Sequence, residues 1–132
     1  MARTTAASVR FEKKRELILA AAQDILYRHG VRGMTLAGVA AKVGLNAPGV
    51  TYYFKKKEDL AAACFLAGIS RLDDIMRQAE RQKDAASRLA HVFERFFARH
   101  RAVRLGEESQ IAPLGEMRTL DEPHRSVVRE AF

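Results

Sequence analysis

Cysteine, proline and glycine are all scarce in this sequence, and each shortage excludes a class of protein. The single cysteine, Cys64, cannot form a disulfide within the chain, so a disulfide scaffold is excluded and a reducing environment is favoured. With 3 Pro and 8 Gly in 132 residues, the chain is neither collagen-like nor a low-complexity disordered segment. A hydrophobic fraction of 48% is normal for globular proteins, so we expect one folded domain, or one domain plus a part of another.

Long apolar runs are also lacking. The N-terminal segment MARTTAASVRFEKKRE is polar and basic and has no apolar stretch of the length that a signal peptide needs. No window approaches the roughly 20 apolar residues of a membrane-spanning helix. The sequence therefore predicts a cytoplasmic protein that does not bind membranes.

Patterns that carry catalysis or bind metals are weak. The four histidines are scattered, and none stands at a metal-ligand spacing from cysteine or acidic residues. No glycine-rich phosphate loop is present, and Glu107 with Glu108 is more typical of a solvated loop than of an acid–base pair. We predict that the protein is not an enzyme and holds no metal and no cofactor.

Negative charge is scarce at one end of the chain. Residues 1–57 hold eleven Lys and Arg against three acidic residues, a net charge of +8, whereas residues 58–132 hold twelve against thirteen, a net charge of −1. The whole excess of positive charge therefore belongs to the N-terminal part. This division is typical of a polyanion-binding head on a neutral body.

The apolar residues recur with helical spacing, and no segment alternates as a strand does, so we predict an all-α fold. Helices are expected over about residues 11–29, 36–43, 46–54, 60–82 and 85–103, with a short one within 111–120 and another opened by Pro123. The predicted buried stripe of the first helix includes Phe11 and Leu17. The fifth helix should turn the following side chains inward, as core or as pocket lining: Leu89, Val92, Phe93, Phe96 and Phe97.

A helix-turn-helix is predicted around Gly44. Thr35 is placed to cap the second helix and Asn46 to cap the third, while Gly44 supplies the positive φ of the sharp corner between them. Ala40, four residues before the glycine, lets the third helix cross the second closely. Such a third helix fits the major groove of B-DNA.

The exposed face of the third helix has side chains suited to DNA. Val50 and Phe54 should face the core with Leu45. The positions that point elsewhere are mostly small or hydroxyl-bearing: Ala47, Gly49, Thr51, Tyr52 and Tyr53. Small residues let the backbone approach base edges, and hydroxyls reach bases or phosphates. Lys55, Lys56 and Lys57 then stand at the start of the next helix, where backbone N–H groups also favour a phosphate.

Each of these features has a more ordinary explanation when taken alone. A lysine triplet is usually a solvated turn, and adjacent tyrosines are more often core or rim aromatics. Their combination with the tight turn, in the only strongly basic part of the chain, raises DNA binding above these alternatives.

At these residues the sequence resembles the tetracycline-repressor (TetR) family of bacterial transcriptional regulators. The resemblance covers roughly residues 12–65, in which the order and the spacing of the following elements agree: Gly30, Thr35-Leu36, Val39-Ala40, Gly44, the run Val50-Thr51-Tyr52-Tyr53-Phe54, and Lys57-Glu58-Asp59-Leu60. Two departures stand out: Thr51 replaces a usual tyrosine, and Pro48 stands where a small residue is common.

The resemblance implies a set of DNA contacts. Thr35, Tyr53 and Lys57 would contact phosphates. The residues in or beside the groove would be Asn46, Ala47, Gly49, Thr51 and Tyr52. Lys55 joins the phosphate contacts through its place in the lysine triplet.

The resemblance also implies an organisation and a function. Residues 1–57 would form the three-helix DNA-binding domain, and 58–132 the first helices of an all-helical effector-binding and dimerisation domain, apparently truncated at its C-terminus. The full-length protein would be a homodimeric regulator, most often a repressor, that a small-molecule effector releases from a palindromic double-stranded DNA operator. The alternative is a basic helical module that binds nucleic acid or acidic proteins without sequence readout. The residues do not identify the effector site.

Overall fold

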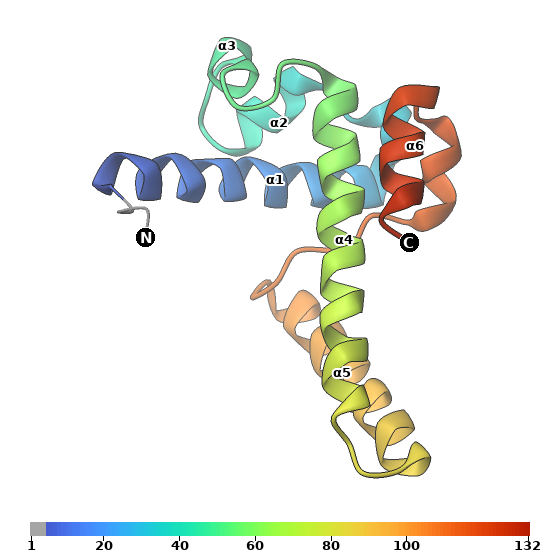
Figure 1. The fold of residues 1–132 in the computed structure, drawn as a ribbon. Helices are drawn as coiled ribbons and strands as arrows, with labels where there is room; N and C mark the ends of the chain where they lie inside the picture. The colour runs from blue at the N-terminus through green and yellow to red at the C-terminus, as the bar shows by residue number, and fades with distance from the viewer. Residues whose placement is uncertain (1–4) are drawn as a thin grey trace.

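The computed structural model describes residues 5–132 as helices joined by short loops (Figure 1). In chain order the elements are α1 (Ala6–Gly33), α2 (Leu36–Lys42), α3 (Ala47–Thr51), α4 (Lys57–Glu80), α5 (Ala85–Leu105), the 3-10 helix η1 (Leu114–Thr119) and α6 (Glu122–Glu130). Within the described residues there is no strand, so the all-α prediction is confirmed.

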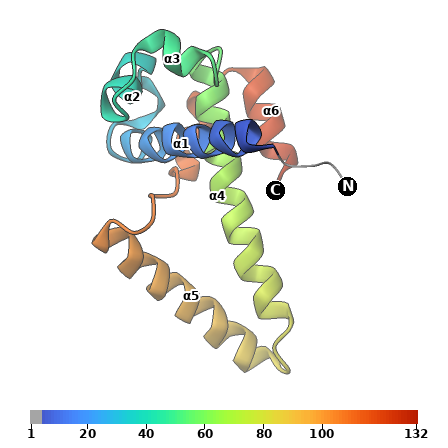
Figure 2. The same cartoon turned by 90° about the vertical axis from the view of Figure 1, so that its left-hand side faces the viewer.

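The long helix α4 organises the molecule. It crosses α1, and its N-terminal end lies beside α2 and α3 at one end of the molecule (Figure 1). At the other end the chain reverses, and α5 returns at an angle to α4, so that the two helices form a V (Figure 2). The chain then passes through η1 to α6, which packs beside the N-terminal half of α4.

Local signals in the sequence set where the short helices begin. Thr35 Oγ1 accepts a hydrogen bond from the backbone N–H of Gly38 at 3.0 Å, and Asn46 Oδ1 accepts one from Gly49 at 2.9 Å. Each satisfies a backbone donor that has no partner within its helix. Both predicted caps are confirmed.

The corner between α2 and α3 is closed by a glycine motif. Gly44 has φ of +70°, which a residue with a Cβ rarely adopts. The N–H of Leu45 donates to the carbonyl of Ala40 at 2.8 Å, and that of Gly44 to Ala41 at 3.4 Å, which is the Schellman pattern of helix ends. The corner predicted from Gly44 is therefore present. Gly30, also at φ +70°, breaks α1 shortly before its end.

One hydrophobic core joins the N-terminal helices to the later elements. It contains buried side chains of α1, α2, α3 and the first half of α4, and the C-terminal part adds Ala112, Leu120 and Val128. Phe65 and Leu60 of α4 are fully buried within it. The buried amide of Gln23 donates to the carbonyl of Cys64 at 3.4 Å, which links α1 to α4. The first three helices therefore share their core with α4 and α6.

The predicted buried stripe of α1 is wrong at its N-terminal end. Phe11 is 36% exposed and Leu17 is 58% exposed, whereas the buried residues of α1 begin at Ile18. The helix also begins at Ala6, earlier than predicted, because Thr5 Oγ1 accepts a hydrogen bond from the N–H of Ser8 at 3.2 Å.

The predicted inward face of α5 is also wrong. The helix has no buried residue: Phe97 is 69% exposed, Leu89 59%, Phe93 54% and Phe96 47%, and Val92 is half-buried. Among the described elements α5 packs mainly against α4, and none covers its phenylalanines. Helical spacing of apolar residues predicts that one face of a helix is apolar, but it does not predict which other element packs against that face.

Two helix ends differ from the predicted positions. α3 stops at Thr51 rather than near Phe54, because the N–H of Tyr53 turns back to the carbonyl of Val50. α4 begins at Lys57 rather than at Leu60, because the carboxylate of Asp59 accepts a hydrogen bond from the N–H of Lys56 at 3.1 Å.

Candidate nucleic-acid interface

The anchoring face of α3 is buried, and this orients the rest of the helix outward. Val50 is fully buried, Phe54 is 5% exposed, and Leu45 packs against the core. Ala40 on α2 is 2% exposed at the crossing of the two helices. The prediction that Val50, Phe54 and Leu45 face inward is therefore confirmed, and the opposite side of α3 faces solvent.

The structure leaves every predicted DNA-contacting residue at least partly accessible. The exposed residues are Thr35, Asn46, Tyr52 and Lys55, and the half-buried residues are Ala47, Gly49, Thr51, Tyr53 and Lys57. These residues come from the start of α2, from α3 and from the turn into α4, elements that lie at the same end of the molecule (Figure 1). We call this set the α3 face.

Hydrogen bonds within the α3 face decide which polar groups remain for a ligand. Asn46 uses its side-chain oxygen as the cap of α3, which leaves the two N–H donors of its amide. Thr51 donates its hydroxyl proton to the carbonyl of Pro48 at 3.0 Å, so its methyl group and oxygen lone pairs remain. Thr35 accepts from Gly38 through Oγ1 and keeps its own proton as a donor.

An aromatic cluster holds the two tyrosines against α1. The ring of Phe11 lies 4.8 Å from that of Tyr53 and 6.0 Å from that of Tyr52, and the tyrosine rings are 5.1 Å apart. Edge-to-face and tilted pairs of this kind contribute about 0.5–1.5 kcal/mol beyond their buried area. Phe11 therefore supports the α3 face, a role that its helical spacing in the sequence did not reveal.

A cation–π contact adds a second link between α1 and the end of α3. The guanidinium of Arg15 lies 4.9 Å from the centre of the buried Phe54 ring. Only the packing of α1 on α3 brings these two residues together, so the sequence carried no signal for the contact. The two links fix the position of α3 relative to α1.

The cations of this region divide into paired and accessible groups. Asp24 forms ion pairs with Lys42 and with Arg28, and the Lys42 ammonium is the main cause that lowers the pKa of Asp24. Lys57, in the first turn of α4, donates from Nζ to the carbonyl of Arg32 at 3.3 Å, which places its charge beside the C-terminal end of α1. Lys55 and Lys56 are exposed, and neither has an acidic partner within residues 5–132. The accessible positive charge therefore gathers at the turn between α3 and α4.

A histidine from α6 reaches the first turn of α4. His124 Nε2 lies 2.8 Å from Asp59 Oδ1, and Nδ1 contacts the carboxylate of Asp121. Both ring nitrogens can donate only in the imidazolium form, and the two carboxylates, Asp59 first, raise the pKa of His124. His124 is likewise the main cause that lowers the pKa of Asp59. The residue that caps α4 is thus tied to α6.

This contact predicts a pH-dependent contribution to stability. The contribution of His124 is full below its ordinary pKa of 6.5 and is lost as the pH rises through the raised value. That of Asp59 is full above its ordinary pKa of 3.8 and is lost as the pH falls through the lowered value. We expect His124→Gln to destabilise the protein most between pH 3.8 and pH 6.5, where both groups are charged, and least in alkaline solution. Urea unfolding across the pH range measures this effect. A destabilisation that stays constant with pH would contradict the charged pair.

The fold and the α3 face define a helix-turn-helix DNA-binding protein. Residues 18–64 match the family model described as bacterial regulatory proteins, tetR family. This segment runs from within α1 through α2 and α3 into α4, so it contains the whole turn and the predicted contact residues. Over residues 18–64 the chain is therefore similar to the N-terminal DNA-binding domain of TetR-family transcriptional regulators. A search of curated proteins finds no match to the sequence.

Groups that would support other chemistry are few in the described part of the chain. In residues 5–132, no three His, Cys, Asp or Glu side chains are grouped so that they could hold a metal ion. No helix in this part of the chain has the length and apolar character needed to cross a membrane. Burial raises the pKa of Cys64 to about 12, so its thiol stays protonated at neutral pH.

Proposed function

We propose that the protein is a repressor that binds a palindromic operator as a homodimer and is released by a small-molecule effector. The observation that carries this proposal is the α3 face itself, an accessible recognition helix beside a cationic turn. It lies inside the segment that matches the TetR-family model. Such a regulator would act in the cytoplasm, where bacterial DNA lies.

The contact residues divide by the chemistry that each leaves available. Asn46, with its free amide donors, and Thr51, with its methyl group, suit base edges in the major groove. Gly49 and Ala47 allow the backbone to approach the bases. The Tyr52 side chain is 74% exposed and can enter the groove beside them. Phosphates would be held by Thr35, Tyr53, Lys55 and Lys57.

Dimerisation would set the spacing of the two recognition helices. They must lie about 34–36 Å apart to enter successive major grooves on one side of the DNA. Because α4 begins beside α3 and extends away to the α4–α5 end, a ligand that shifts α4 would change this spacing. Release of DNA then requires that the ligand bind the two arrangements with different affinity.

The experiment that tests this function is a binding titration against genomic DNA fragments with scrambled competitor, repeated at several salt concentrations. Selective retention of a palindromic fragment by the protein would support a sequence-specific regulator. Equal affinity for all fragments would instead leave a basic helical module that binds nucleic acid without reading its sequence, and the regulatory proposal would be abandoned.

Replacement of Lys55 by alanine should weaken binding to operator and to scrambled DNA by the same factor, because a phosphate contact carries no sequence information. The slope of log affinity against log salt should become shallower by about 0.9 for each phosphate contact that is removed. The matched control is Lys83→Ala, an exposed lysine between α4 and α5. An unchanged slope in Lys55→Ala, or an equal effect in the control, would remove Lys55 from the interface.

A further inference from the structure

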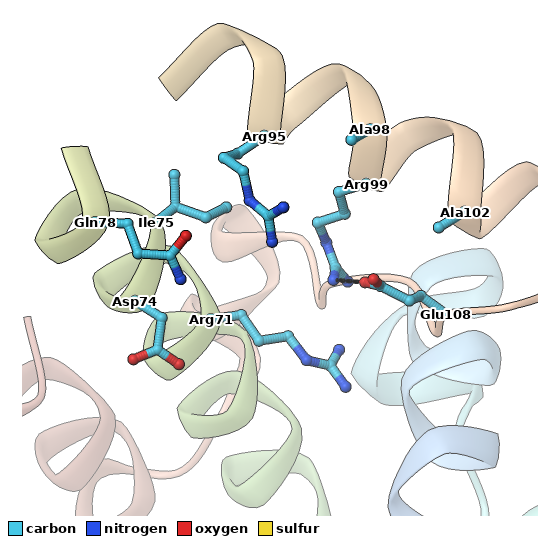
Figure 3. Close-up of a pocket in the computed structure, with 9 residues that line it drawn as sticks. All are labelled: Arg71, Asp74, Ile75, Gln78, Arg95, Ala98, Arg99, Ala102 and Glu108. Carbon is cyan, nitrogen blue, oxygen red and sulfur yellow. Dashed lines mark hydrogen bonds and ion pairs between the residues drawn. The ribbon is translucent and has the colours of Figure 1, made fainter. Parts of the chain in front are cut away.

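A cleft between α4 and α5 is lined by an unusual set of arginines (Figure 3). Its volume is about 510 Å³, which is the size of a pocket for a small organic molecule. The lining residues that concern its chemistry are Arg71 and Asp74 of α4, Arg95 and Arg99 of α5, and Glu108 of the following loop. Apolar side chains on the walls include Ile75, Ala98 and Ala102.

Arg71 has a buried donor with nothing to bind. Its Nη1 atom is shielded from solvent and has no hydrogen-bond partner among the described residues. The side chain extends from α4 toward the side of the cleft where Arg99 and Glu108 lie (Figure 3). A buried donor of a charged group that lacks an acceptor is costly, so proteins seldom retain one without a partner or a function.

Two hydrogen-bonding partners hold the Arg99 guanidinium in place, but they leave no negative charge to balance Arg71. Its guanidinium pairs with the carboxylate of Glu108 and donates to the carbonyl of Ser109 at 2.6 Å. Its side chain is only 12% exposed, and burial, followed by the charge of Arg71, lowers the pKa of Arg99. Two guanidinium groups therefore repel each other across a partly desolvated space.

The nearby acids do not balance this charge. Glu108 is engaged by Arg99, and Asp74 is exposed and forms no ion pair with Arg71 or Arg95 within residues 5–132. Three arginines face two acids, of which one is already paired. An added anion would supply the missing acceptor and reduce the repulsion in one step.

We propose that the α4–α5 cleft binds a small molecule with a carboxylate or phosphate group, gripped by Arg71 and Arg99, whose apolar part lies against Ile75, Ala98 and Ala102. The planar guanidinium matches both oxyanions with paired N–H donors, which a lysine could not do. Only the further step, that this molecule is the effector, rests on the function proposed above. Binding itself does not depend on it.

Arg71 should contribute little to the stability of the ligand-free protein. It brings an unpaired buried donor and a repulsive charge, so Arg71→Gln should leave the melting temperature unchanged or raise it. The same variant should bind anions poorly. A residue that is retained only for packing would show the opposite, a lower melting temperature with no effect on any ligand.

The direct test is calorimetric titration and thermal unfolding of the chain with four probes of equal chain length: hexanoate, hexyl phosphate, hexanol and hexylamine. We expect hexanoate or hexyl phosphate to bind and raise the melting temperature, and the comparison of these two separates a carboxylate ligand from a phosphate ligand. Hexanol and hexylamine should bind at least about tenfold more weakly, because they lack the oxyanion that the arginines recognise.

The variants make the result specific to the cleft. Arg71→Gln and Arg99→Gln should each weaken binding of the anionic probe by about tenfold or more, whereas Arg81→Gln, an exposed arginine just after α4, should bind as the wild type does. The proposal is overturned if no anionic probe binds, if hexanol binds equally well, or if Arg71→Gln retains wild-type affinity. Operator binding is measured separately. If the protein binds no operator, the proposed regulatory function is rejected, whereas the anion site is still decided by the titration with the four probes.

Discussion

Replacement of Phe65 by alanine is expected to lower the free energy of unfolding by about 3–5 kcal/mol, the usual cost of removing a fully buried phenylalanine. Phe65 lies on α4 with no exposed surface, in the core that α4 shares with α1 and with later elements. The loss combines the transfer of the ring to water with the cavity left behind. Since domains are stable by only about 5–15 kcal/mol, urea unfolding followed by circular dichroism should show a large shift of the midpoint.

The chain offers a control of identical chemistry. Phe97 on α5 is 69% exposed, so Phe97→Ala should change the free energy of unfolding by less than about 1 kcal/mol. The contrast tests the finding that α5 leaves its phenylalanines uncovered while α4 buries its own. Equal losses in the two variants would show that the α5 face is covered in solution.

The features that the sequence could predict are those that depend on neighbours in the chain. Thr35 and Asn46 act as caps because each accepts a hydrogen bond from an N–H three residues on, and Gly44 turns the corner through its own φ. These interactions are encoded within four or five residues, so their pattern is readable without the fold. The capping carboxylate of Asp59 also stands three residues after Lys56 and could have been recognised, which would have placed the start of α4 correctly.

The features that could not be predicted depend on which elements meet. The apolar spacing of Phe11 and of the α5 phenylalanines is the same as that of buried residues, yet Phe11 lies before Ile18, where the buried part of α1 begins, and the α5 phenylalanines are exposed. The contact of His124 with Asp59 joins residues 65 positions apart. The cleft likewise needs α5 to return at its observed angle to α4 before Arg71 and Arg99 become neighbours.

The helix α4 connects the features that matter for function. Asp59 in its first turn caps the helix beside the lysine turn, Phe65 sits in the core, and Arg71 lines the cleft. Asp59 and Arg71 are separated by twelve residues, or about 18 Å along the axis at 1.5 Å per residue. A displacement at the cleft would therefore reach the α3 face through one continuous helix. Such coupling requires only that the ligand prefer one of two positions of α4.

The change Asn46→Asp should greatly weaken operator binding while leaving the fold intact. Aspartate caps a helix as well as asparagine does, so its carboxylate can still accept from the N–H of Gly49 and hold the start of α3. It lacks the amide donors, however, and brings a negative charge to the surface that is proposed to face DNA. Loss of a base contact of this kind costs about 1–3 kcal/mol, and repulsion by phosphates adds to it, so affinity should fall by about a hundredfold or more.

Two measurements distinguish the loss of a DNA contact from the loss of the fold. The melting temperature of Asn46→Asp should equal or exceed that of the wild type, because a carboxylate also interacts favourably with the N-terminal end of a helix. Gln82→Glu makes the same amide-to-carboxylate change just after α4, at the end of the molecule away from α3, and should bind the operator normally. If Asn46→Asp folds as expected and still binds the operator with wild-type affinity, the cap of α3 lies outside the groove. The proposed docking of the recognition helix would then have to be rotated away from its N-terminus.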